Sequence, residues 1–165
     1  MRQEDSQLNS TLLNGCGCLV ILMILTAIAL PSYLNRVSKA RYSEAKQYVG
    51  SMNRAQQAHF AEKGDFAISI DALGLGMKTE TTNYKYSLHS TKQAAFNYGV
   101  SKQEKLPSYV GSVLLVPTYP NAPKNEITTT SILCEADDRG TIEPAEPIYQ
   151  NGKVICGKGT TQVTK

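Results

Sequence analysis

Four cysteines are the residues of this sequence whose chemistry is easiest to name, and they form two pairs. Cys134 and Cys156 lie near the C-terminus, where a disulfide between them would enclose 156 − 134 − 1 = 21 residues. On the chain-entropy model, closing such a loop stabilises a fold by roughly 3–4 kcal/mol. The bond forms only in an oxidising compartment. The pair therefore predicts a disulfide and a location outside the cytoplasm.

The second pair, Cys16 and Cys18, lies inside an apolar run. A Cys-x-Cys pair could bind a soft metal or carry acyl groups. On a helix, however, residues two apart point in divergent directions, so joint ligation is awkward. The preceding residues resemble a lipoprotein cleavage box, but that box should follow an apolar run and here it comes first. We interpret both cysteines as small packing residues on a helix surface.

No other group of residues predicts catalysis or metal binding. His59 lies beside an apolar stripe and His89 ends a strand-like run. Two acidic pairs lack the spacing of a calcium-binding loop, and we interpret them as solvated. They are Asp137-Asp138 and Glu143-x-x-Glu146. The sequence contains no nucleophile elbow, phosphate-binding loop or dinucleotide fingerprint. We expect a non-enzymatic protein without catalytic residues, metal, cofactor or small-molecule substrate.

Nucleic acid is not an expected partner either. The net charge is +3 over 165 residues, which is weak and dispersed. One set of basic and aromatic residues gives a faint signal for single-stranded DNA. It comprises Lys102, Lys105, Lys124, Tyr109 and Tyr119. The length fits one domain plus an anchor.

The anchor is the uncharged run from Cys16 to Leu30, which extends to Leu12–Leu34, a stretch of 34 − 12 + 1 = 23 residues. About 20 apolar residues span a bilayer as a helix. A buried core helix would have a polar face, which this run lacks. A signal peptide cut after Ala29 is the alternative, since Ala27-Ile28-Ala29 fits the cleavage pattern. The basic n-region is poor, because Arg2 is opposed by acidic neighbours. A retained membrane helix is therefore the favoured reading.

The chain then continues as an amphipathic helix over Arg36–Glu62. Apolar residues recur at steps of three and four, which is the pattern of a helix with one buried face. They are Val37, Ala40, Tyr42, Ala45, Tyr48, Val49, Met52, Ala55, Ala58 and Phe60. Charged and amide residues are expected on the remaining surface. They are Arg36, Lys39, Arg41, Glu44, Lys46, Gln47, Arg54, Gln56 and Gln57. Pro31 should kink the long helix where its two halves meet, and Gly64-Asp65 should end it.

A small sheet is predicted after the helix. A loop over Lys63–Asn83 should be pinned on the helix by its apolar residues, which are Phe66, Ile68, Ile70, Leu73 and Leu75. Alternating runs then predict four strands in a meander. They cover Tyr84–His89, Ala94–Val100, Tyr109–Val116 and Thr128–Glu135. The tail, Asp137–Lys165, is expected to be irregular. The fold class is α+β, a long N-terminal helix packed on a small antiparallel β-sheet.

Several motifs resemble type IV pilins, most closely the pilin-like G/H group of cyanobacteria. Ala29-Leu30-Pro31-Ser32-Tyr33-Leu34-Asn35 is similar to the end of the pilin hydrophobic segment. Three later stretches resemble the second half of the pilin helix. They are Glu44-Ala45-Lys46, Asn53-Arg54-Ala55-Gln56-Gln57-Ala58 and Gly64-Asp65-Phe66-Ala67. The resemblance implies a minor pilin-like or pseudopilin-like structural subunit. Its expected partners are other pilin subunits, through the N-terminal helix, the inner membrane and a prepilin peptidase.

The resemblance also assigns a processing frame. Counting back from Pro31 places the family's cleavage glycine at Asn9, its first mature residue at Ser10 and its helix glutamate at Asn14. The frame is kept while the glycine and the acid are missing, so these positions are degenerate equivalents. The implied division is a leader-like segment over residues 1–9, a transmembrane half-helix over 10–35 and a globular head over 36–165.

We expect the protein to cross the inner membrane once, with its head outside the cytoplasm. It is also expected in an extracellular pilus. Arg36, Lys39 and Arg41 follow the apolar segment. By the positive-inside rule alone, these residues would place the head in the cytoplasm. The resemblance and the C-terminal cysteine pair favour the outside. The alternative function is a soluble secreted binding module released after Ala29.

Overall fold

The computed structural model describes residues 23–25, 40–119, 123 and 126–163. The chain divides into two compact units, Met1–Ala40 and Arg41–Lys165. In the first unit, Met23, Ile24 and Leu25 are helical, and their side chains are exposed. We refer to the second unit as the head.

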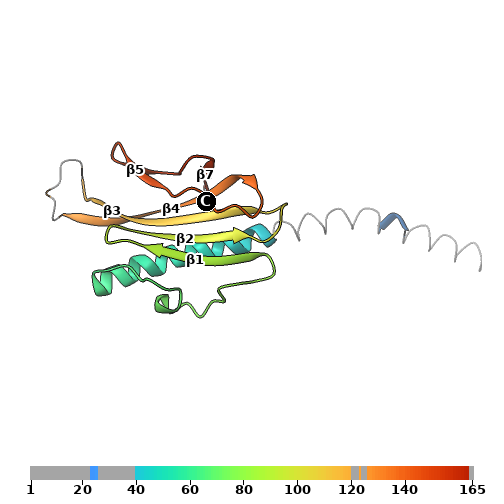
Figure 1. Cartoon of the computed structure of the whole chain (residues 1–165), viewed down its shortest axis with the longest axis horizontal. Coiled ribbons are helices and arrows are strands. Elements are labelled where there is room, and N and C mark those ends of the chain that lie inside the picture. Colours follow the sequence, from blue (N-terminus) through green and yellow to red (C-terminus); the bar gives the residue numbers. More distant parts are fainter. Residues whose placement is uncertain (1–22, 26–39, 120–122, 124–125, 164–165) are drawn as a thin grey trace, which may run out of the picture. The chain divides into compact units, whose positions relative to one another are not determined.

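A helix over residues 40–63 lies along one face of the head's sheet (Figure 1). It ends where the sequence predicts, because the Gly64 N–H donates to the Phe60 carbonyl (2.8 Å) and Gly64 has a φ of 79°. Glycine adopts that left-handed conformation without the strain that a Cβ would cause. The buried face centres on Ala45, Val49 and Met52, each with no exposed surface.

The predicted meander is confirmed. The four strands are β1 (Tyr84–Ser90), β2 (Ala94–Ser101), β3 (Pro107–Pro117) and β4 (Ile127–Arg139). They form three antiparallel pairs, β1 with β2, β2 with β3 and β3 with β4. A further strand, β7 (Thr160–Gln162), adds beyond β4, so the strand order is β1-β2-β3-β4-β7. The fold of the described head is α+β, as predicted.

Residues of the sheet alternate between two apolar layers. On the helix side, Tyr84, Tyr86 and Tyr109 pack with the buried helix residues. On the other side, Phe96 and Val110 belong to a second cluster, which the C-terminal residues cover in part. Both faces of the sheet are therefore buried over much of its area, which explains why β2 and β3 are buried at nearly every position.

The tail was predicted to be irregular, and that prediction is wrong in part. Strands β5 (Ile148–Gln150) and β6 (Lys153–Ile155) form a hairpin. Its turn residues, Asn151 and Gly152, have φ values of 52° and 78°. Positive φ at both central residues is the requirement of a tight hairpin turn, and Asn-Gly meets it at low cost. Each of β5, β6 and β7 has only three residues, too few for an alternating pattern to be recognised.

The loop after the helix carries one short 3-10 helix, η1 (Asp71–Leu73). Of the apolar residues expected to pin this loop, Phe66 and Ile70 are buried and Leu73 packs against the helix-side core. Ile68 was predicted to pack as well, but its side chain is 84% exposed. Apolar alternation in a loop does not fix which side faces the core, because no regular backbone geometry imposes it.

Candidate functional site

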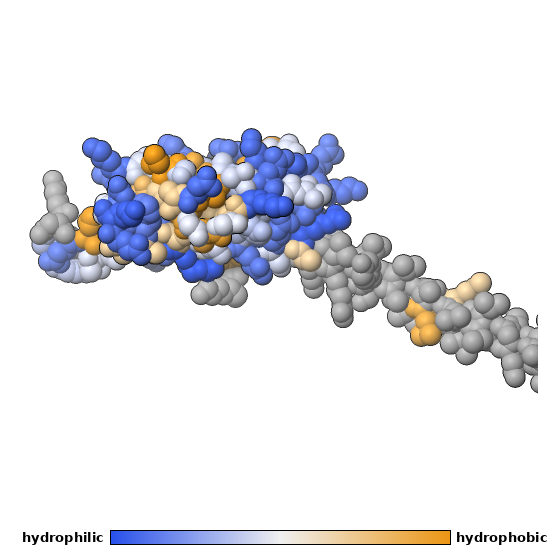
Figure 2. All heavy atoms as spheres, turned by 90° about the horizontal axis from the view of Figure 1, so that it is seen from below, coloured by the Kyte–Doolittle hydropathy of each residue, from blue (hydrophilic) through white to orange (hydrophobic). Residues whose placement is uncertain are grey.

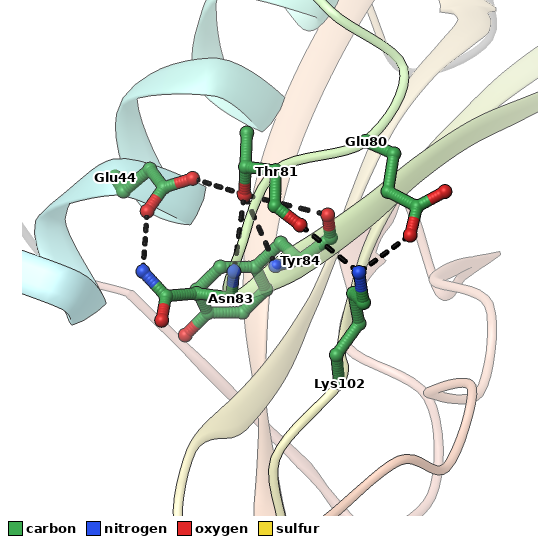
Figure 3. Close-up of polar contacts among 6 residues, drawn as sticks. All are labelled: Glu44, Glu80, Thr81, Asn83, Tyr84 and Lys102. Carbon is green, nitrogen blue, oxygen red and sulfur yellow. Dashed lines mark hydrogen bonds and ion pairs between the residues drawn. The ribbon is translucent and has the colours of Figure 1, made fainter.

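The Glu44 carboxylate, on the helix, is hydrogen-bonded to the loop that leads into β1 (Figure 3). Glu44 Oε1 accepts a hydrogen bond from the Thr81 hydroxyl (2.6 Å), while Oε2 accepts one from Asn83 Nδ2 (3.0 Å). Oε1 also accepts from the Tyr86 hydroxyl (3.3 Å), which Figure 3 does not draw. The Thr81 hydroxyl oxygen in turn accepts the backbone N–H of Tyr84 (3.1 Å). One acidic side chain therefore fixes both the loop and the start of the sheet on the helix.

The charge of Glu44 also acts on the tyrosines beside it. Burial raises the pKa of Tyr84 above its ordinary value, and the Glu44 carboxylate raises it further. The pKa of Tyr86 rises for the same two reasons, and also because its hydroxyl donates to Glu44. Beyond this cluster, Lys102 forms an ion pair with Glu80 and holds the pKa of that carboxyl below its usual range. The contacts of Glu44, Thr81 and Lys102 fix the loop before β1 in place.

A second polar group joins the middle of the helix to the centre of the sheet. Asn53 is 4% exposed, and its Nδ2 donates to the Ile132 carbonyl (2.9 Å). Its Oδ1 accepts from Asn97 Nδ2 (2.9 Å), a fully buried side chain of β2. Buried amides are costly unless they are hydrogen-bonded, so the bonds fix the position of the helix along the sheet. The helix comes close enough because Gly111 of β3, opposite Asn97, has no side chain.

Gln56 was expected on the exposed surface of the helix, and this expectation is wrong. Its side chain has no exposed surface. Its Nε2 donates to the Ala67 carbonyl (3.0 Å), and its Oε1 accepts the Ala67 N–H (2.9 Å). The amide thus pairs with one backbone unit much as a neighbouring strand would. Gln56 was expected at the surface because its side chain is polar. The two hydrogen bonds to Ala67 satisfy its amide inside the core.

The predicted disulfide between Cys134 and Cys156 is present, with a Cα–Cα distance of 5.8 Å. Cys134 lies on the sheet face away from the helix, within the second apolar cluster. The bond joins β4 to the chain just after β6. Nearby, Gly157 lies against the Ala145 and Glu146 carbonyls, and a Cβ there would approach them to 2.8 and 2.6 Å. The C-terminal residues are therefore packed closely on the sheet.

Of the residues considered for catalysis or metal binding, the structure brings together only His89 and Glu146 among those it describes. His59 pairs with Asp65 (3.5 Å), while His89 stands 3.8 Å from Glu146, whose carboxylate accepts the Tyr98 hydroxyl (2.6 Å). Among the described residues, no three His, Cys, Asp or Glu side chains are grouped to hold a metal ion.

The basic and aromatic set considered for DNA does not form one surface. Tyr109 is fully buried in the helix-side core, whereas Tyr119 is 50% exposed. Lys124 lies outside the described residues. Much of the head's surface in Figure 2 is hydrophilic, with smaller apolar areas. An open groove of about 670 Å³ does run between the helix and β4, lined by Lys46, Arg54 and Ser131 among others.

The predicted processing residues, Asn9, Ser10 and Asn14, and the predicted kink at Pro31 lie outside the described residues. Within the part of the chain that the structure describes, no helix is both long and apolar enough to span a membrane.

Sequence reasoning missed the polar group formed by Asn53, Asn97 and Gly111. A signal was present on the strand, since Ala95, Asn97 and Gly99 alternate with Phe96 and Tyr98. Small and polar residues on one side of a buried strand indicate the close approach of another element. Asn53 gave no such signal, because it stands beside apolar helix residues and resembles a boundary position.

Of the comparisons with known proteins, one gives a match. No curated protein and no solved structure matches the chain. A family model described as type IV pilin-like G and H matches residues 42–157, which include most of the helix, the meander and the disulfide. Because this match covers more than half of the chain, the protein belongs to the type IV pilin-like G and H family.

Proposed function

We propose that the protein is a minor structural subunit of a type IV pilus or a related filament. It is stored in the inner membrane and assembled through its apolar N-terminal segment. The observation that carries the proposal is the family match over residues 42–157. Pilin-like proteins of this family are structural, and the chain's expected partners are other pilin subunits.

The head's construction fits this role. Its helix is held to the sheet by an apolar face, by Glu44 and by Asn53. A pull on the helix would therefore be shared between apolar packing and several buried hydrogen bonds. The described residues of the apolar segment, Met23–Leu25, are helical and expose large apolar side chains, as a membrane or neighbouring helices would require.

The proposed division is a leader-like segment over residues 1–9, a membrane half-helix over 10–35 with a kink at Pro31, and a head over 36–165. Peptidase cleavage after Asn9 would expose Ser10 as the new N-terminus. Asn14 would replace the charged residue that pilins place there. A carboxylate in lipid is costly unless paired, and an amide avoids part of that cost while losing the charge pairing. We therefore propose a sparse subunit in the filament, with the head outside the cytoplasm.

N-terminal mass spectrometry of the protein, purified from cells through a C-terminal tag, tests this proposal. A start at Ser10, especially an N-methylated one, would establish pilin-type processing at the degenerate site. A start at Leu30 would mean signal-peptide cleavage and a soluble secreted module, and would overturn the proposal. An intact N-terminus would remove the processing step and leave a permanently anchored pilin-like protein.

A substitution tests membrane storage separately. Leu22→Glu places a charge in the middle of the apolar segment, where it costs about 2–3 kcal/mol or more in a bilayer. We expect the variant to be lost from the membrane fraction and from sheared filaments, whereas Leu22→Ile should behave as the wild type. Normal membrane retention of the glutamate variant would contradict storage through this segment.

A further inference from the structure

The outer edge of β4 is only partly covered by β7. The ladder between them joins Cys134, Glu135 and Ala136 to β7, and the Val163 N–H extends it by one bond to the Leu133 carbonyl (2.9 Å). From residue 127 to residue 132, no described strand pairs with β4 on this side. Among the described residues, about half of the strand therefore has a partner, β3, on one side only.

Two hydrogen bonds show which backbone groups point outward here. The Leu133 carbonyl accepts a hydrogen bond from the Val163 N–H, and the Thr129 carbonyl accepts one from Gln57 Nε2 (3.4 Å). Residues two apart in an antiparallel strand direct their N–H and C=O groups to the same side. Ser131, midway between them, therefore presents both of its backbone groups outward, and it is exposed.

The opposite edge of the sheet is covered at the start of β1. The loop before β1 returns along it, and the Tyr86 N–H donates to the Thr79 carbonyl (2.7 Å). The Thr81 N–H donates to the Tyr84 carbonyl (2.8 Å). Proteins also protect edge strands with charged residues or prolines on the strand itself. Residues 127–133 of β4 (ITTTSIL) contain neither.

The surroundings of Ser131 are positively charged. On the helix side lies the groove of about 670 Å³, which contains Lys46 and Arg54. On the other side, a hollow of about 350 Å³ beneath the β5–β6 hairpin contains Lys153. No aspartate or glutamate lines either one. Lys46 is paired with Glu135 (3.3 Å), whereas Arg54 and Lys153 are exposed.

We propose that the β4 edge at Ser131 binds an extended peptide segment carrying carboxylates, which adds to the sheet as a further strand. The backbone of Ser131 forms the ladder bonds, as in other cases of strand addition. Side chains of the added strand alternate between its two faces, so acidic residues on one face meet Arg54 and those on the other meet Lys153. The inference does not depend on filament assembly, because it concerns a surface of the head alone.

A pair of labelled peptides tests this proposal on the full-length chain in detergent micelles. The probe is a fluorescein-labelled Thr-Glu-Glu-Val-Thr-Glu-Glu-Thr peptide, which presents glutamates on both faces of a strand, and the comparison peptide has lysine in place of each glutamate. By fluorescence anisotropy, we expect the acidic peptide to bind at least about tenfold more tightly, as two favourable ion pairs in place of two repulsions would give. Equal affinities would overturn the proposal.

Two sets of variants separate the backbone from the charges. Ser131→Pro removes the outward N–H but no bond to β3, so the fold should tolerate it. We expect Ser131→Pro to lower the affinity for the acidic peptide at least about fivefold. The matched variant Ser131→Thr keeps the N–H and should bind the peptide as the wild type does. The double reversal Arg54→Glu with Lys153→Glu should shift the preference to the lysine peptide. Unchanged binding of a correctly folded Ser131→Pro protein would overturn the proposal.

Amide hydrogen exchange gives a direct readout. The Ser131 amide should exchange freely in the protein alone and become protected when the acidic peptide is added. Protection in the free protein would mean that this edge is already occupied, by the chain itself or by a second copy, and would overturn the proposal. Whether the chain enters filaments has no bearing on any of these outcomes.

Discussion

Gly111 of β3 and Asn53 of the helix lie in direct apposition. A Cβ built on Gly111 would stand 2.7 Å from Nδ2 of Asn53 and 2.7 Å from Cγ1 of Val49. Both atoms belong to side chains with less than 5% exposed surface, which have little room to move. The distance between helix and sheet is therefore set by the absence of a side chain at one strand position.

Gly111→Ala should destabilise the head. The added methyl group must displace Asn53, Val49 or the helix, and overpacking of this kind costs about 1–3 kcal/mol. Gly50→Ala is the matched control, because a Cβ at Gly50 has no neighbour within 4 Å. That variant should stabilise the helix by up to about 1 kcal/mol. Urea unfolding of both variants measures the two effects, and equal shifts in the same direction would contradict this account of the interface.

Asn53→Ala should destabilise the protein by about 1–3 kcal/mol, because it leaves the Ile132 carbonyl and the Asn97 amide without their partner in a buried site. Asn97→Ala removes the other end of the same bond. In a double-mutant cycle, the two changes should be clearly non-additive, since they remove one shared interaction. Gln57→Ala, on a part-buried amide of the same helix, is a control that should cost less. Additive effects would mean that the two asparagines do not act as a pair.

Removing the disulfide by Cys134→Ser with Cys156→Ser should lower the free energy of unfolding by about 3 kcal/mol, because the unfolded chain regains the freedom of the closed loop. The loss should be greatest in the C-terminal residues, which the bond ties to β4. Limited proteolysis can locate it. Cleavage should begin within residues 141–163, while fragments that contain the helix and β1–β3 persist. Uniform degradation would show that the bond stabilises the whole head instead.

Alkaline conditions should destabilise the head through its buried tyrosines. Burial raises the pKa of Tyr84, Tyr86, Tyr98 and Tyr109, with further increases from nearby carboxylates. In the unfolded chain these phenols titrate near pH 10. Above about that pH the unfolded state loses protons that the folded state retains, so stability is complete below it and falls as pH rises.

Urea midpoints measured between pH 8 and pH 11 check this expectation, with Tyr84→Phe as the matched variant. The phenylalanine keeps the buried ring and removes one titrating group, so its stability should fall less steeply above about pH 10. A slope identical to the wild type would mean that Tyr84 does not contribute to the alkaline loss.

The sequence predicted those parts of the head that regular periodicity governs. Four strands were found because Tyr84–His89 and its successors alternate, and the helix end was found because Gly64 supplies a left-handed residue. The disulfide followed from cysteine spacing alone. These features depend on local rules, which a single sequence displays.

The features that were missed depend on contacts between distant residues. Gln56 is buried because its amide forms hydrogen bonds with the Ala67 backbone, and no local pattern predicts that partner. Among the described residues, the β4–β7 ladder stops before Ser131, which only the assembled sheet reveals. Periodicity shows which face of an element is buried, but not where a buried polar group finds its partner or where a ladder stops.

The meander has a consequence for the order in which the head forms. β1, β2 and β3 each pair with the strand that follows in the chain, so the loops to be closed are short. Short loops lose little conformational entropy on closure, and local topologies fold quickly. β7, in contrast, pairs with β4 across the intervening β5–β6 hairpin, so a longer loop must be closed. The meander would thus form before residues 140–163 are secured, so that the two cysteines are oxidised on a largely folded head.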